Sequence, residues 1–188
     1  MIGVSSSLTA FPADGYTARW GRWDLDGDEA LTLRWENEGW TATGELSRER
    51  ANYVVRISPT WQVRQFLLFR DLDEPDLWLG TDGGGRWGEV NGAHRTDLDG
   101  CVDIHLPATP FSHTLAVRRL RLEVGDAADE VAATIDVETL GVVPVRRRYH
   151  RIGERRWSYA EHDSGDEFEF EIDTYGLAGD IDTRFRRH

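Results

Sequence analysis

The chain of 188 residues contains no lysine, so all 22 basic residues are arginine, and 34 acidic residues bring the formal net charge to −12. A nucleic acid or an anionic membrane surface is bound through basic protein surfaces that neutralise phosphates. The charge balance therefore argues against both as partners. Two explanations stay open: a GC-rich genome would account for the missing lysine, and adaptation to high salt would account for the acidity.

Cysteine occurs once, at Cys101, which excludes an internal disulfide and a zinc site built from several cysteines. No stretch approaches the ~20 apolar residues of a membrane-spanning helix. Residues 1–9 are too short and too rich in serine for a signal sequence. We therefore expect a cytoplasmic protein with one domain over residues 1–188, in which residues 1–12 form a loose N-terminal segment.

Motifs for metals and cofactors are also missing. Residues 24–29 are similar to a calcium-binding loop, but its glycine stands fourth instead of sixth and its twelfth position is Trp35 instead of glutamate. The glycines at 83–85 lack the lysine and helix that follow a phosphate-binding loop. We predict no cofactor and no metal, because the six histidines show no ligand spacing: His94, His105, His113, His150, His162 and His188.

What the chain has in abundance is alternation of polar and apolar residues, the pattern of β-strands with one buried face. In residues 167–173 every second residue is acidic, and across residues 53–69 most odd positions are apolar, in two segments joined at Pro59. About a dozen such segments, and no helix of three turns, predict an all-β, mostly antiparallel barrel, roll or sandwich.

Residues 87–122 have the least repetitive pattern. Within them, residues 102–106 alternate as a half-buried strand does, and Pro107 and Pro110 then end the ladder. Residues 115–124 predict a second strand, reached through a short irregular connection.

The apolar phase of that second strand switches between Val117 and Leu120, which indicates a bulge or a bend. Arg118 and Arg119 lie at the switch, so we expect one of them to point toward the apolar side. There a planar guanidinium could bind a phosphate or sugar hydroxyls. The alternative is that this cluster and residues 146–148 pair with carboxylates in solvent.

Two histidines raise the question of catalysis. Asp103 and His105 share one strand face and could act as an acid–base pair, although a surface cross-strand pair is the simpler interpretation. Ser112 and His113 are adjacent, but no Gly-x-Ser-x-Gly elbow accompanies them. The residues themselves therefore give catalysis little support.

Tryptophan is more frequent than the core of a domain this size requires. Core packing accounts for most of these side chains, and a surplus favours a surface that faces sugars or lipids. The eight are Trp20, Trp23, Trp35, Trp40, Trp61, Trp78, Trp87 and Trp157.

Four segments have a distinctive order and spacing: Gly-Arg-Trp at 85–87, Leu-Asp-Gly-Cys-Val-Asp-Ile at 98–104, Thr-Pro-Phe at 109–111 and Thr-Leu-Ala-Val-Arg-Arg-Leu at 114–120. With these segments the chain resembles a bacterial family of glycolipid-binding proteins, formerly a domain of unknown function. The resemblance covers nearly the whole chain. The chain departs from the family pattern at His105, His113 and Ala116.

The resemblance implies a curved β-roll or half-barrel, similar in outline to carriers of lipoproteins and lipids, with a concave face for glycolipids. We therefore predict a non-catalytic binding protein for a glycolipid-like amphiphile, of undetermined oligomeric state. Two alternatives stay open: an enzyme that acts on a lipid or sugar through Asp103 and His105, and an interaction protein that pairs through a sheet edge. The expected ligand contacts are Trp87, Asp103, Thr109, Arg118, Arg119 and Tyr149.

Overall fold

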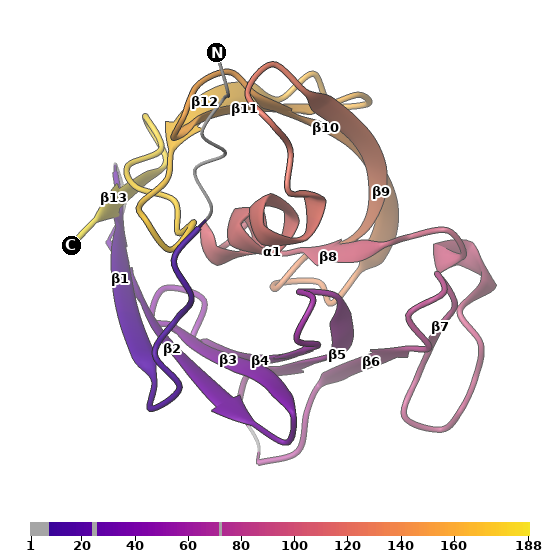
Figure 1. The fold of residues 1–188 in the computed structure, drawn as a ribbon. Coiled ribbons are helices and arrows are strands. Elements are labelled where there is room, and N and C mark those ends of the chain that lie inside the picture. Colours follow the sequence, from indigo (N-terminus) through magenta and orange to yellow (C-terminus); the bar gives the residue numbers. More distant parts are fainter. Residues whose placement is uncertain (1–7, 24–25, 72) are drawn as a thin grey trace.

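The computed structural model describes residues 8–23, 26–71 and 73–188. This part of the chain forms two β-sheets that curve around helix α1 (Phe111–Leu120), seen end-on in Figure 1. Within the described ranges the sheets stay separate and do not close into a barrel, so the predicted all-β half-barrel is confirmed. Residues 1–7 of the expected loose segment, and residues 24 and 25 of the acidic turn, lie outside the described part.

The larger sheet is antiparallel throughout and has the order β13-β1-β2-β3-β4-β5-β6-β7. Its alternating sequences place one row of side chains on the core and the other in solvent. The two segments predicted across residues 53–69 are β4 and β5. The strands are β1 (Tyr16–Arg22), β2 (Asp28–Glu36), β3 (Gly39–Leu46), β4 (Ala51–Ile57), β5 (Val63–Phe69), β6 (Leu77–Thr81), β7 (Trp87–Gly88) and β13 (Phe185–Arg187).

The smaller sheet has the order β12-β11-β10-β9-β8. Its strands are β8 (Asp103–His105), β9 (Ala127–Ile135), β10 (Val142–Arg151), β11 (Arg156–Glu161) and β12 (Glu167–Glu171). β8 pairs parallel with β9. Parallel neighbours need a crossover connection, and α1 is that connection.

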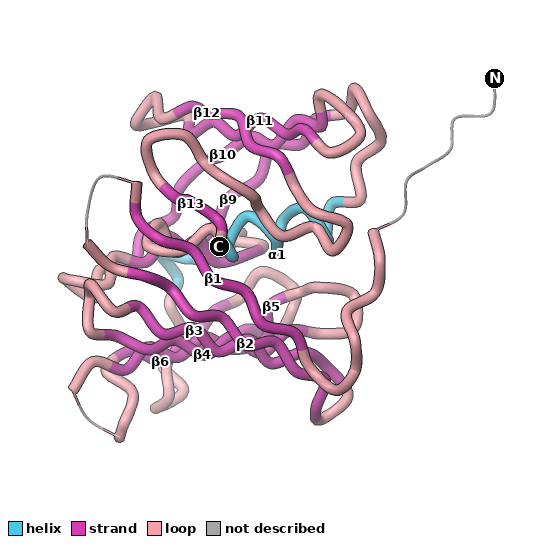
Figure 2. Tube along the Cα trace, turned by 90° about the vertical axis from the view of Figure 1, so that its left-hand side faces the viewer, coloured by secondary structure: helices cyan, strands magenta, loops and turns pink. Residues whose placement is uncertain are grey.

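Helix α1 corrects the expectation of a strand over residues 115–124 and of an irregular connection before it. Eight of its ten residues are buried, because the helix lies inside the fold with a sheet on either side (Figure 2). A helix that is buried on all sides has no polar face, so its sequence lacks the 3.6-residue period of an amphipathic helix. The spacing of Leu115, Val117 and Leu120 was therefore interpreted as that of a strand. Pro110, which we expected only to end a strand, also starts the helix, since its φ of −64° suits a first turn.

Strand β8 corrects a second expectation. Residues 102–106 were predicted to have a wet polar face, yet Asp103 is 0% exposed and His105 is 4% exposed, while Val102 is 47% exposed. The strand pairs with β9 in its sheet and contacts α1 and β5, and all three of its residues are buried. Its polar side chains therefore need partners inside the core.

A short 3₁₀ helix, η1 (Thr96–Leu98), completes the elements. No helix in the described part of the chain is long and apolar enough to cross a membrane.

Candidate functional site

A cavity of about 500 Å³ lies at the C-terminal end of α1, and both sheets contribute to its wall. This volume is in the range of ~300–1,000 Å³ that is usual for small-molecule sites. Nine of the lining residues are apolar: Leu8, Ala10, Trp40, Pro59, Trp61, Val117, Leu122, Trp157 and Ile172. The other four are Arg118, Arg121, Glu123 and Arg151.

Trp61 shapes one wall from the turn between β4 and β5. Its backbone is left-handed, with φ of 66°, which is a strained conformation for a bulky side chain. The turn is fixed by the Trp61 amide, which donates to the Ser58 carbonyl at 2.9 Å, and by Ser58 Oγ, which accepts from the Gln62 amide at 3.1 Å. Strain of this kind persists where the surroundings hold it, often at binding sites.

Arg118 lies against this wall. Its guanidinium carbon is 4.4 Å from the ring centroid of Trp61 and 4.7 Å from that of Phe11. Nη1 donates to the Tyr175 carbonyl at 2.7 Å and to the Thr9 carbonyl at 3.2 Å, whereas the buried Nε has no hydrogen-bond partner in residues 8–23, 26–71 and 73–188. Among the described residues, Arg118 therefore has carbonyl and aromatic partners but no carboxylate.

The electrostatics of Arg118 follow from this environment. Burial lowers the pKa of its guanidinium to about 10, because the charged form loses hydration. Asp173 offsets part of this effect, and Arg121 adds to it by repulsion. The group stays charged at neutral pH.

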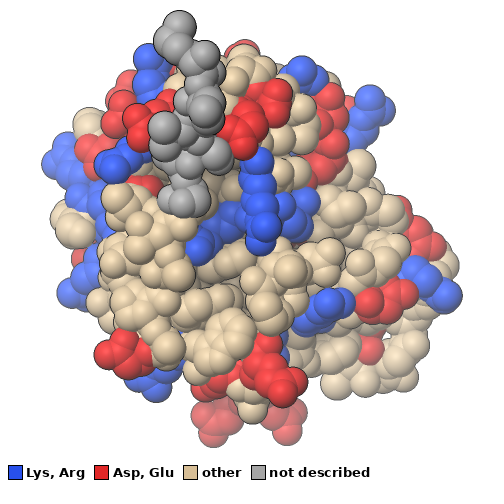
Figure 3. Space-filling model, viewed as in Figure 1, with Lys and Arg blue, Asp and Glu red and all other residues tan. Residues whose placement is uncertain are grey.

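Arg121, Arg118 and Arg151 form what we call the arginine rim of the cavity. Arg121 ends α1 with φ of 50°, a left-handed position where glycine is usual. Arg151 donates to the carbonyls of Leu122 at 2.8 Å and Glu154 at 2.7 Å, which fixes the chain after the helix. Figure 3 shows basic side chains gathered in the middle of the face where Figure 1 shows α1.

The opposite wall includes Trp157 on β11. This side chain is 2% exposed, and its indole Nε1 has no hydrogen-bond partner within the described part of the chain. Buried indole N–H groups usually find an acceptor. The wall therefore holds an unsatisfied donor.

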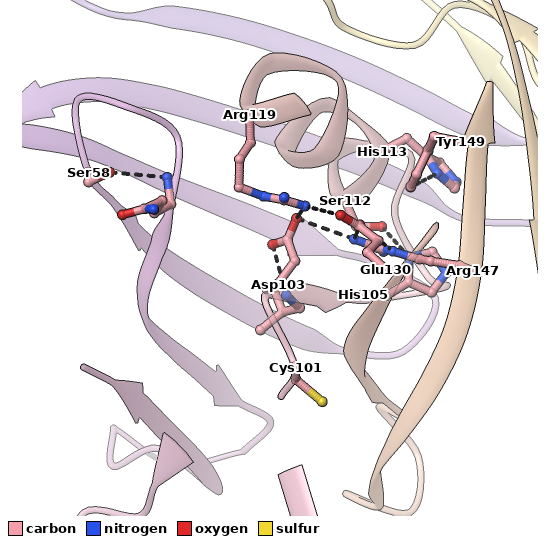
Figure 4. Close-up of polar contacts among 12 residues, drawn as sticks. Ser58, Cys101, Asp103, His105, Ser112, His113, Arg119, Glu130, Arg147 and Tyr149 are labelled. Carbon is pink, nitrogen blue, oxygen red and sulfur yellow. Dashed lines mark hydrogen bonds and ion pairs between the residues drawn. The ribbon is translucent and has the colours of Figure 1, made fainter. Parts of the chain in front are cut away.

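Of the six residues predicted to contact ligand, Arg118 is the one among the residues that line this cavity. Asp103 and Arg119 instead belong to a buried ion network with Glu130 and Arg147 (Figure 4). Asp103 Oδ2 lies 3.0 Å from Arg119 Nη2 and 3.3 Å from Arg147 Nη2, and Glu130 Oε1 lies 2.6 Å from Arg147 Nη2. The network joins α1 to β8, β9 and β10.

Burial opposes the charge of both carboxyl groups in this network. It raises the pKa of Asp103 in spite of Arg119 and Arg147. For Glu130, the attraction of the same two arginines outweighs burial and lowers the pKa. The charges of the two carboxyl groups and the two guanidinium groups thus balance one another. A role of Asp103 or Arg119 in ligand contact stays a prediction.

Thr109 lies in a different buried cluster. Its Oγ1 donates to Glu29 Oε1 at 2.6 Å and accepts from the Phe111 amide at 3.0 Å, at the start of α1. Burial raises the pKa of Glu29 to about 7, although Thr109 and Tyr53 donate hydrogen bonds to it. Sequence reasoning missed Glu29, although this residue has the same phase as Leu31 and Leu33 and the alternation of β2 therefore places it on the core face.

Tyr149 and Trp87 also lie in the core. The Tyr149 hydroxyl is 2.9 Å from His113 Nδ1, and Trp87 Nε1 donates to the Cys101 carbonyl at 2.9 Å. Their exposures are 0% and 2%. Both side chains have internal partners, and contact with a ligand stays a prediction for each.

The proposed acid–base pair does not form. Asp103 pairs with arginines, whereas His105 Nδ1 is 3.1 Å from the Ser112 hydroxyl. That hydroxyl also lies within reach of the carbonyls of Leu106 and Thr109. Burial holds the pKa of His105 well below its usual range, so the ring is neutral in a closed core. Within the described ranges, no group of three or more His, Cys, Asp or Glu is placed to hold a metal ion.

Comparison with solved structures gives one similar protein, a DUF1089-family protein from Pseudomonas aeruginosa. The two structures have a TM-score of 0.68 and 25% sequence identity, over 97% of this chain and 96% of the other. No curated protein sequence matches the chain significantly. The profile of a family described as "Putative glycolipid-binding" matches residues 17–187, and the chain therefore belongs to this family.

Proposed function

We propose that the protein binds a glycolipid-like amphiphile without transforming it. The apolar chain of the ligand lies in the cavity at the end of α1, and its polar end faces the arginine rim. The observation that carries the proposal is the cavity itself, about 500 Å³ with nine apolar lining residues and charged groups at one part of its wall. The family description points to the same class of ligand.

The wall suits an alkyl or acyl chain. Burial of such a chain contributes about 0.8 kcal/mol per CH₂. Trp40, Trp61 and Trp157 supply flat apolar surface at fixed positions. Trp40 and Trp61 stack with their ring centroids 6.2 Å apart, so this part of the wall is preformed.

Titration with dodecyl maltoside below its micelle concentration, followed by calorimetry and tryptophan fluorescence, tests the proposal. Ala10 is exposed and lines the cavity, so Ala10→Trp fills it without entering the core. Ala93→Trp adds the same side chain at an exposed site away from the lining residues. We expect binding to the parent chain and to Ala93→Trp, and its loss in Ala10→Trp. Equal binding by both variants, or none by the parent chain, contradicts the proposal.

The two alternatives have less support. A substrate cannot reach Asp103 or His105 unless the core opens, since both are nearly inaccessible. Pairing through the edge strand β12 is opposed by its three exposed glutamates, Glu167, Glu169 and Glu171, because charges on an edge disfavour strand addition.

A further inference from the structure

We infer that the cavity prefers amphiphiles whose polar end carries an anionic group, such as a phosphate, sulfate or carboxylate, held by Arg118 and Arg121. The inference rests on the amphiphile binding proposed above. The inference adds that the polar end of this amphiphile is negatively charged.

The first argument is charge. The chain has a net charge of −12, yet three of the four charged residues lining the cavity are arginines and the fourth is Glu123. Arg118 is 9% exposed, and among the described residues its partners are two carbonyl oxygens and two rings. A buried guanidinium without a paired carboxylate is unfavourable, and Asp173 offsets only part of the cost of burying Arg118. A bound anion at the rim would supply that charge.

The second argument is the backbone of Arg121. A left-handed conformation costs an L-residue roughly 1–2 kcal/mol, and glycine or asparagine adopts it more readily. Arg121 has this conformation with φ of 50° and lines the cavity. Among the described residues its exposed side chain has no hydrogen-bond or ion-pair partner, so its donors are available to a ligand.

The helix dipole is too weak to neutralise the charges of both arginines. The C-terminal end of a helix carries about half a negative charge, which attracts nearby cations. Arg118 and Arg121 together carry two full positive charges, which exceed this partial negative charge. The hydrogen bonds of Arg118 also go to the carbonyls of Thr9 and Tyr175, outside the helix, and not to the C-terminal carbonyls of α1.

The test compares dodecyl phosphate with dodecyl maltoside, which share one alkyl chain, by calorimetry below their micelle concentrations. Arg121→Asn removes the charge, and asparagine tolerates the left-handed backbone, so the variant keeps the fold. Arg50→Asn is the matched control, because Arg50 is also exposed with φ of 49° but is not among the lining residues. Inorganic phosphate alone is the control without an alkyl chain.

We expect the parent chain to bind dodecyl phosphate at least tenfold more tightly than dodecyl maltoside. Arg121→Asn should weaken binding of dodecyl phosphate by about tenfold, which is about 1.4 kcal/mol, and leave dodecyl maltoside unchanged. Arg50→Asn should change neither. Added salt should weaken only the binding of dodecyl phosphate.

The remaining possible results overturn the inference, the proposed function or both. Equal affinity for the two amphiphiles, or no effect of Arg121→Asn, overturns the inference and leaves amphiphile binding standing. Inorganic phosphate binding as tightly as dodecyl phosphate supports the anion site and overturns the proposed function. Absence of binding to all three probes overturns both.

Discussion

Tyr53 donates a hydrogen bond of 2.5 Å to Glu29, which joins β4 to β2 in the buried face of the larger sheet. The second carboxyl oxygen of Glu29 is buried and has no hydrogen-bond partner in the ranges that the structure describes. Burial raises the pKa of this carboxyl to about 7, from a usual 4.5. The folded state therefore holds a proton that the unfolded state releases at lower pH.

The stability of the fold should depend on pH through Glu29. The pKa of Glu29 is higher in the folded state than in the unfolded state. Its contribution to the free energy of unfolding is therefore complete below pH ~4.5, and about 3 kcal/mol of it is lost as pH rises through 7. Glu29→Gln keeps the shape and cannot ionise, so it should gain stability relative to the parent chain between pH 5 and pH 8. Urea unfolding at both pH values measures this difference. A stability difference that is the same at the two pH values would show that Glu29 has an ordinary pKa.

The same tyrosine should make the stability of the fold sensitive to a substitution at Gly44. Gly44 pairs with Tyr53 across β3 and β4, and a Cβ atom there would lie 2.1 Å from the Tyr53 ring. Gly44→Ala must displace that ring, so we expect a loss of roughly 1–3 kcal/mol in unfolding free energy. Gly84→Ala is the control, since its nearest contact would be a carboxylate oxygen at 3.3 Å and its loop is exposed. Equal thermal stability of the two variants would contradict the prediction.

The sequence predicted those strands that have one wet face. Alternation located β4 within residues 53–69 and β12 within residues 167–173, because exposure of every second residue leaves a period of two. It also located β5, but with the wrong face after a register shift in the β4–β5 pairing, since Phe66 and Leu68 are buried where odd positions were expected in the core. Helix α1 left no such signal, since it is covered on all sides. Its end gave none either, because Arg121 occupies the position where glycine would have marked it.

The cavity was less predictable than the sheets for a physical reason. Leu8, Trp61, Arg118 and Trp157 come from distant parts of the chain and meet only in the folded state. The sequence predicted that one of Arg118 and Arg119 points to the apolar side, but it did not single out Arg118, and the strand on which that expectation rested is helix α1. Nothing local indicated the left-handed turn of Trp61.

The buried ion network should be sensitive to loss of one charge. Asp103→Asn leaves Arg119 and Arg147 with a single carboxylate, and removal of one partner from a buried pair costs about 3–5 kcal/mol. Arg156→Ala breaks an exposed ion pair with Glu169 and should cost less than about 1 kcal/mol. Chemical denaturation of both variants measures the contrast. Similar losses in the two would mean that the network is as solvated as a surface pair.

His113 should remain neutral throughout the range in which most histidines titrate. It is 4% exposed, its Nδ1 is 2.9 Å from the Tyr149 hydroxyl, and burial with repulsion from Arg147 and Arg184 lowers its pKa to about 3. The unfolded chain takes up a proton near pH 6.5 that the folded chain does not, so this residue lowers stability as pH falls below that value. The ring proton shifts of His113, followed by NMR, should therefore stay constant from pH 7.5 to pH 5. A shift change centred near pH 6.5 would show that water reaches this part of the core.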